Sequence, residues 1–184
     1  MTKTTVTAVH FEPRSFVPNN PRLPALIYQG AFDSPGCDLA TLMERRFQDN
    51  GWPPQWRDGI YDFDHYHTQG HEVLGIAAGS AKLMLGGDGW REINAQAGDV
   101  LVLPAGTGHR RIVQSDDFLV IGAYPPGQVG DIVREQATPA ILQRITLLGF
   151  PPRDPVLGED GPMLRLWADI GISGRSPPSN TTML

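Results

Sequence analysis

Cysteine is nearly absent from this sequence. Cys37 is the single cysteine among 184 residues, so no disulfide can form within the chain, and a reducing compartment is the simplest expectation. The chain also lacks long apolar runs: its first ten residues carry no signal-peptide core, and no stretch approaches the roughly 20 residues that cross a bilayer. We therefore expect a cytoplasmic protein with no membrane partner.

Positive charge is scarce as well. Lys and Arg number 15 against 20 Asp and Glu, a net charge of −5, and no block of like charges occurs. Nucleic-acid binding draws mainly on clustered Lys and Arg, so a nucleic-acid partner is not expected. The sequence contains nothing that resembles a basic helix of the kind that lies on a membrane surface.

Turn-forming residues, by contrast, are abundant, with 21 Gly and 17 Pro. Short strands joined by tight turns use such residues, so the composition favours an all-β domain, and the length suits one domain with a real core. From Gly59 onward the apolar residues recur with period two, which indicates seven strands in a sandwich or barrel. We expect these strands at 59–67, 72–78, 81–85, 90–93, 99–103, 109–113 and 118–124.

Outside this region the pattern is mixed. Strands are expected near 5–11 and 23–29, and helices from Ser34 or Asp38 through Phe47 and from Thr138 through Ile145. Trp52 and Trp56 lie in a rigid connector that covers the barrel rim or a dimer contact. The chain is thus divided into an N-terminal arm, a helix with connector, a barrel core, a C-terminal extension and a flexible tail, at 1–30, 31–56, 57–127, 128–170 and 171–184.

Four residues form a candidate metal site. His65 and His67 are two apart, so on a strand their imidazoles point the same way, roughly 6–7 Å apart, and can converge on one ion at ~2.1 Å. Glu72 begins the next strand and can add a carboxylate oxygen, and His109 follows a turn that aims it inward. Three nitrogens and one oxygen leave two positions open on an octahedral ion. The alternative is a set of buried histidines satisfied by hydrogen bonds.

These residues fall into two motifs. The first reads G-x5-H-x-H-x(3,4)-E-x6-G and the second G-x5-P-x-G-x2-H-x3-N; the chain matches every fixed position except the final Asn, where Val113 stands. The sequence therefore resembles the cupin superfamily over residues 59–113, and more narrowly is similar to small bacterial monocupins of the YjlB-like type, which have no settled activity. The matching residues are Gly59, His65, His67, Glu72, Gly79, Gly98, Pro104, Gly106 and His109.

The resemblance implies a fold and a cofactor. The fold would be a double-stranded β-helix, the cupin or jelly-roll barrel, with one or two short flanking helices. The four residues would hold one divalent transition metal: Fe, Mn, Ni, Zn or Co. Cupin barrels often pair by exchanging N-terminal strands, so a homodimer is also implied. The reaction stays open, because the fold hosts dioxygenases, isomerases, decarboxylases, sugar sensors and storage proteins.

Further residues are assigned by strand alternation. Arg111 shares the parity of His109 and could anchor an anionic substrate, although Arg110 and Arg111 could equally extend to solvent or pair with carboxylates. His71 should face away from Glu72, so we expect it to support the ligands from behind or to lie at the surface, with direct metal contact the weaker alternative. The remaining candidates for lining the pocket, with plain core packing as the alternative, are Tyr61, Phe63, Met84 and Tyr124.

The sequence as a whole predicts a metal-dependent cupin enzyme acting on a small polar molecule, by dioxygenase or isomerase-type chemistry. Glu72 is either a ligand throughout or a catalytic base that leaves the metal. The first alternative is a non-catalytic module that binds a small molecule, and the second is a purely structural barrel.

Overall fold

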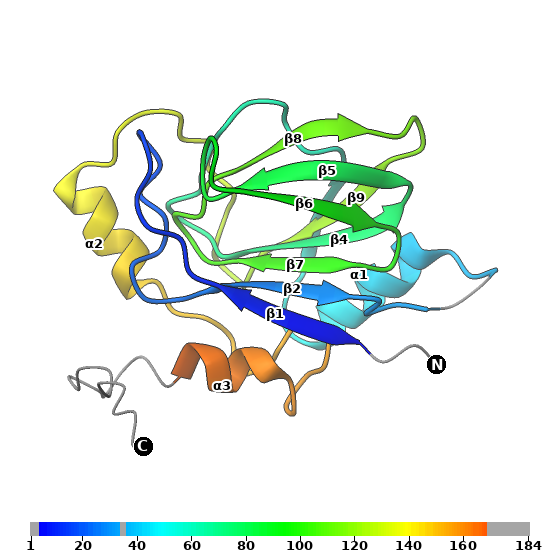
Figure 1. The fold of residues 1–184 in the computed structure, drawn as a ribbon. Coiled ribbons are helices and arrows are strands. Elements are labelled where there is room, and N and C mark those ends of the chain that lie inside the picture. Colours follow the sequence, from blue (N-terminus) through cyan, green and yellow to red (C-terminus); the bar gives the residue numbers. More distant parts are fainter. Residues whose placement is uncertain (1–3, 34–35, 169–184) are drawn as a thin grey trace, which may run out of the picture.

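Two antiparallel sheets lie face to face (Figure 1) in the part of the chain that the computed structural model describes, residues 4–33 and 36–168. The larger has six strands in the order β1-β2-β7-β4-β9-β3, and the smaller has three in the order β6-β5-β8. The bounds are β1 Thr5–Val9, β2 Ala25–Gln29, β3 Pro54–Asp58, β4 Glu72–Ala78, β5 Ser80–Leu85, β6 Arg91–Gln96, β7 Val100–Leu103, β8 His109–Gln114 and β9 Leu119–Ala123. This arrangement confirms the expected all-β barrel of the double-stranded β-helix type.

The inner strands of the six-stranded sheet are buried on both faces, as β4 shows. Leu74 and Ile76 point inward and pack with Leu83 of the small sheet, whereas Val73 and Ala77 belong to a second cluster on the outer face. Because both faces are buried, β4 reads as a continuous apolar run after Glu72 instead of an alternating one. Glu72 shares the inward parity of Leu74, which directs its carboxylate into the barrel.

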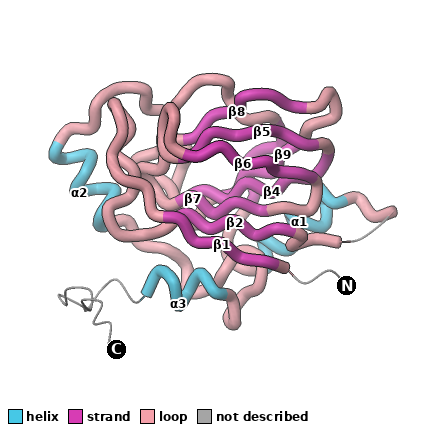
Figure 2. Tube along the Cα trace, in the orientation of Figure 1, coloured by secondary structure: helices cyan, strands magenta, loops and turns pink. Residues whose placement is uncertain are grey.

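Helices α1 (Leu39–Asp49) and α3 (Pro162–Ala168) pack on the outer face of this sheet, and α2 (Pro139–Leu147) lies beside one end of the two sheets (Figure 2). Helix α1 begins at Asp38, whose carboxylate accepts hydrogen bonds from the backbone N–H groups of Ala40 and Thr41. Its buried Met43 and Phe47 join the outer cluster. Helix α2 is capped by Thr138, and α3 buries Met163 and Trp167. Of these helices, the sequence predicted α1 and α2.

A buried carboxylate ties the C-terminal region to β2. Asp154 accepts a hydrogen bond of 2.5 Å from the Tyr28 hydroxyl, and its two oxygens also accept from the backbone N–H groups of Val156, Leu157 and Met163. Burial and the adjacent Asp154 raise the pKa of Tyr28. This Tyr–Asp pair lies in the outer region of the fold, with β2 and α3.

Two segments differ from the sequence-based expectation. Residues 59–67 form no continuous strand, because His65 bridges to His109 while its neighbour Tyr66 bridges to Val133, so no single partner supplies a ladder. Residues 54–58, expected to be a connector, form β3 at the sheet edge, where the first position tolerates Pro54. The arm at 1–30 contributes β1 and β2 to the six-stranded sheet.

The tail expected at 171–184 lies outside the described residues. None of the helices in the described ranges is long and apolar enough to cross a membrane.

Candidate metal centre

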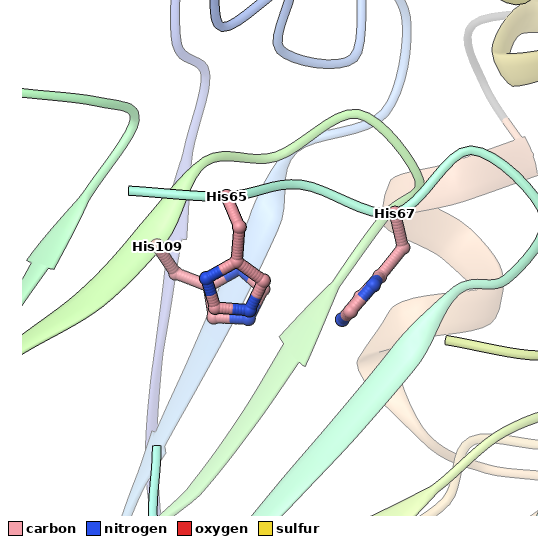
Figure 3. A group of neighbouring side chains, drawn as sticks. All are labelled: His65, His67 and His109. Atoms are coloured by element: carbon pink, nitrogen blue, oxygen red, sulfur yellow. The ribbon is translucent and has the colours of Figure 1, made fainter. Parts of the chain in front are cut away.

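Three histidine side chains meet at one point inside the barrel. His65, His67 and His109 are all buried, and each offers one ring nitrogen within 4.8 Å of the other two. Figure 3 shows the three imidazoles turned toward one another from the 59–70 segment and from β8. The structure thus brings together residues more than 40 positions apart in sequence, in a group that can hold a metal ion.

Backbone hydrogen bonds bring these residues into place. His65 and His109 pair as an antiparallel bridge, with His109 N donating to His65 O at 3.0 Å. Gly106 N donates to His67 O at 2.7 Å, which joins the turn before His109 to the segment that carries the other two histidines. The positions of the rings are therefore set by the main chain and not by the side chains alone.

The tautomer of each ring is set in the same way. The Nδ1 atoms of His65, His67 and His109 lie 3.1, 2.6 and 3.1 Å from the backbone carbonyl oxygens of Phe63, Asp131 and Thr107. A carbonyl oxygen can only accept, so each Nδ1 carries the proton and donates. The Nε2 lone pair of the neutral ring is then available for a metal ion, the arrangement that orients histidine ligands in metalloproteins.

Glu72 completes the group. Its Oε2 atom lies 3.2 Å from Nε2 of His67 and 3.1 Å from Nε2 of His109. Nevertheless, within the described part of the chain neither His67 Nε2 nor Glu72 Oε2 has a hydrogen-bond partner of acceptable geometry, although both are buried. Leaving such atoms unpaired costs about 1–3 kcal/mol each. A cation bound between them would satisfy both, so the donor set fits a divalent metal.

The electrostatic interactions within the group also favour a bound cation. Burial would raise the pKa of Glu72, but the adjacent His67 and His109 imidazoles outweigh burial and hold that pKa well below its usual range. Burial likewise opposes a charge on His67, yet Glu72 raises the His67 pKa to about 9. The His65 pKa falls to about 3, chiefly through burial and then through His109. The site therefore favours one positive charge beside Glu72.

A cavity of about 820 Å³ opens from the four residues toward solvent. Three of the five residues expected at the pocket line it: Arg111, Tyr124 and Tyr61, which is 50% exposed at the mouth. Arg111 Nε donates to the Ile60 carbonyl at 3.1 Å, and its Nη2 lies 4.0 Å from Asp62. Arg110 points elsewhere and pairs with Asp64 and Asp88.

The other two proposed substrate-binding residues do not line this cavity. Met84 neighbours Leu83 and Leu85, which both face the barrel interior, so alternation places Met84 on the outer face of the small sheet. Phe63 packs beneath the mouth, stacked on Tyr61 at 4.8 Å with the Arg134 guanidinium 4.0 Å from its centroid. Strand parity failed for Phe63 because residues 59–64 form no regular strand.

His71 points away from the ligands. Its Nδ1 accepts from Ala105 N at 3.0 Å, so Nε2 carries the proton and donates to the Leu148 carbonyl at 3.2 Å. The ring packs against Trp167 on the outer face, and burial lowers its pKa to about 4. His71 faces away from Glu72 as expected, but it is buried and not at the surface, and it holds the turn at Ala105 to the C-terminal region.

We expect His71→Ala to lower the free energy of unfolding by about 2–4 kcal/mol, because it leaves two buried backbone groups unpaired and a cavity beside Trp167. Urea unfolding measures the loss, and elemental analysis of the same sample should find the metal content of the wild type. Lost metal at unchanged stability would instead place His71 in support of the ligands.

Three residues around the site make contacts that the sequence did not indicate. Tyr124 was considered for pocket lining or core packing, but its hydroxyl donates to Glu72 Oε1 at 2.5 Å. Trp56, placed at the rim, donates from Nε1 to that hydroxyl at 3.2 Å. Asp131 orients His67 through its carbonyl and binds Thr68 through its carboxylate. No local pattern marks these contacts, since the partners are 52 to 68 residues apart.

A jelly-roll barrel that aims buried imidazoles and a carboxylate into its own open end defines the cupin class, here with a candidate metal centre. The chain belongs to the family of YjlB: it is 35% identical over 157 residues to the uncharacterised protein YjlB of Bacillus subtilis strain 168, a match that covers 82% of this chain and 90% of that protein. No family model matches the sequence.

Two solved structures are also similar. One is an 11S globulin from Wrightia tinctoria described as revealing an auxin binding site, with 10% identity, a TM-score of 0.32, and coverage of 70% of this chain and 26% of the globulin. The other is Streptomyces albus HEPD with 2-hydroxyethylphosphonate and Fe(II) bound, with 11% identity, a TM-score of 0.32, and coverage of 85% of this chain and 30% of HEPD. The chain thus spans under a third of either protein.

Proposed function

We propose that this protein is a metal-dependent enzyme of the cupin class that acts on a small polar molecule, by dioxygenase or isomerase-type chemistry. The observation that supports this most is the convergence of three Nε2 atoms and the Glu72 carboxylate at the floor of an open cavity of about 820 Å³. A metal with a purely structural role would more often be closed off by its ligands, whereas an accessible one can bind substrate.

In this proposal His65, His67, Glu72 and His109 hold the ion. When bound, a divalent Fe, Mn, Ni, Zn or Co would supply Lewis acidity and a template for substrate oxygens. The protein's own contribution is to orient the imidazoles through their Nδ1–H bonds and to keep Glu72 ionised, for the reasons given above.

Arg111 is proposed as the anchor for an anionic group of the substrate. We expect Arg111→Gln to weaken the binding of a carboxylate ligand about 10- to 100-fold, the value of a charged hydrogen bond, without changing metal content. Isothermal titration with a small hydroxy acid measures the change. Arg110→Gln is the matched control, because the neighbouring Arg110 pairs with Asp64 and Asp88 outside the cavity. Equal loss in both variants would contradict a specific anchor.

The proposed function is tested by combining elemental analysis with turnover. Protein purified without added metal is analysed for bound ions, then loaded with Fe(II), Mn(II), Ni(II), Zn(II) or Co(II). Oxygen uptake and product formation are followed across hydroxy acids, thiols and sugars. Metal-dependent turnover of one substrate class, lost in His67→Ala, would support the enzyme. Binding of ligands without turnover under every metal would contradict it.

Ligand binding without turnover would instead support a rival function, a non-catalytic module in which the metal helps hold a small ligand. One reason to consider this rival is that the chain lacks the final Asn of the second motif. Val113, which stands at that position, is 56% exposed and does not line the cavity, so the replacement removes nothing from the site. The rival keeps its other support, which is that no second acid–base pair can be recognised in the sequence.

We also propose a homodimer, with no membrane or nucleic-acid partner. β1 is the outermost strand of the six-stranded sheet and pairs with β2 of its own chain, which leaves its other edge for a second copy. Light scattering after size-exclusion chromatography measures the mass; a monomer at micromolar concentration would contradict the proposal.

A further inference from the structure

A chain of hydrogen bonds leads from the surface of the cavity to the back of Glu72. The Trp56 indole N–H donates to the Tyr124 hydroxyl at 3.2 Å, and that hydroxyl donates to Glu72 Oε1 at 2.5 Å. The three residues come from β3, from the end of β9 and from the start of β4. Tyr124 and Glu72 are almost fully buried, so water does not compete for the bond between them.

The direction of each bond follows from chemistry. An indole N–H can only donate, so the Tyr124 oxygen must accept from Trp56. The Tyr124 proton is then directed at Glu72 Oε1, which lies 2.5 Å from the hydroxyl and accepts it. One carboxylate oxygen, Oε1, is thereby engaged by Tyr124. The other, Oε2, is the atom that faces His67 and His109.

The surrounding backbone is built to keep the two aromatic rings in place. A Cβ atom at Gly122 would overlap the Trp56 indole, and one at Gly130 would overlap the Tyr124 hydroxyl. Both rings therefore pack directly on bare main chain, Trp56 on its partner strand β9 and Tyr124 beneath the 127–133 loop. These contacts restrict movement of the Trp56 indole toward Gly122 and of the Tyr124 ring toward Gly130.

We propose that Tyr124 is a positioning residue that fixes Glu72 as a ligand through one oxygen only, and that Trp56 fixes Tyr124. This inference rests on the proposed metal centre and extends it. With Oε1 engaged, Glu72 occupies a single position on the ion, and the remaining positions stay open toward the cavity. The same bond prevents the carboxylate from swinging away, so Glu72 acts as a ligand throughout and not as a mobile base.

The test uses Co(II), whose visible d–d absorption weakens as its coordination number rises. We expect Tyr124→Phe to bind one Co(II) with about tenfold lower affinity, the usual effect of removing a group that orients a ligand. We also expect weaker d–d bands, because Glu72 is free to bind through both oxygens. Trp56→Phe, which keeps the Tyr124 hydroxyl, should shift both readouts in the same direction by a smaller amount.

Tyr28→Phe is the matched control. It removes the same kind of bond, a buried tyrosine hydroxyl 2.5 Å from a carboxylate, at Asp154 on the outer side of the fold. This variant should be destabilised yet keep the wild-type Co(II) affinity and spectrum. Wild-type values in Tyr124→Phe, or in Trp56→Phe should Tyr124→Phe not fold, would overturn the positioning role alone. A wild-type protein that takes up no stoichiometric Co(II) would overturn the metal centre itself.

Discussion

Replacing His67 with alanine should reduce the affinity for a divalent metal by at least about 100-fold. Removing a residue that only orients a metal-binding side chain lowers metal affinity about 10- to 100-fold. Removing the metal-binding side chain itself should therefore reach or exceed the upper end of that range. His67 is the strongest choice among the four because its Nε2 is buried without a hydrogen-bond partner in the described structure and lies 3.2 Å from Glu72. The substitution also removes the positive partner that keeps Glu72 ionised.

Competition titration with a coloured chelator measures this affinity, and elemental analysis gives the stoichiometry. His10→Ala is the control, because His10 is exposed and distant in sequence from the motifs. It should retain one metal per chain. If His67→Ala bound as tightly as His10→Ala, the converging imidazoles would be a hydrogen-bonded core and not a metal centre.

Removing the metal should destabilise the protein. An ion that binds only the folded chain stabilises it by about 4 kcal/mol at a free concentration 1,000 times its Kd. For a chain of this size 1 kcal/mol corresponds to roughly 2–4 °C, so chelation should lower Tm by about 8–16 °C. The loss has a structural cause, because the Glu72 carboxylate and the His67 ring then face each other in a buried site without the ion.

Differential scanning calorimetry with and without a chelator measures the shift, and dialysis against metal should restore it. The His67→Ala variant provides the control, since a chain that no longer holds the ion should unfold at the same temperature in both buffers. An identical wild-type Tm under the two conditions, with metal shown to be present beforehand, would mean that the ion contributes nothing to folding.

Much of the barrel could be predicted from local sequence patterns. The strands at 72–78 and 81–85 were predicted almost to the residue, because short apolar runs and the glycine turns that bound them are local signals. Helix α1 was found from its apolar stripe and from Asp38 at its start. Residues 59–67 were predicted as a strand because aromatic residues and histidines alternate there with other residues. The prediction was wrong, because this segment does not pair along its length with any one strand.

The residues of the candidate site could likewise be predicted only in part from the sequence. Spacing within the motifs was enough to nominate His65, His67, Glu72 and His109, because the residue types and intervals constrain one another. Met84 was a candidate for lining the pocket but lies on the outer face of its sheet, which only the pairing of β5 with its neighbours decides. His71 was placed by parity on the correct face, but its partners at Ala105 and Leu148 were beyond any local rule.

The sequence by itself determined the class of fold and the set of residues able to bind a metal, because both depend on short-range periodicity and on fixed intervals. Only the tertiary structure decided which atoms face the cavity, which nitrogen of each imidazole is free, and that Trp56 and Tyr124 hold the far side of Glu72. Those features depend on hydrogen bonds between residues that are distant in the chain, and no pattern within one strand encodes the partner on another.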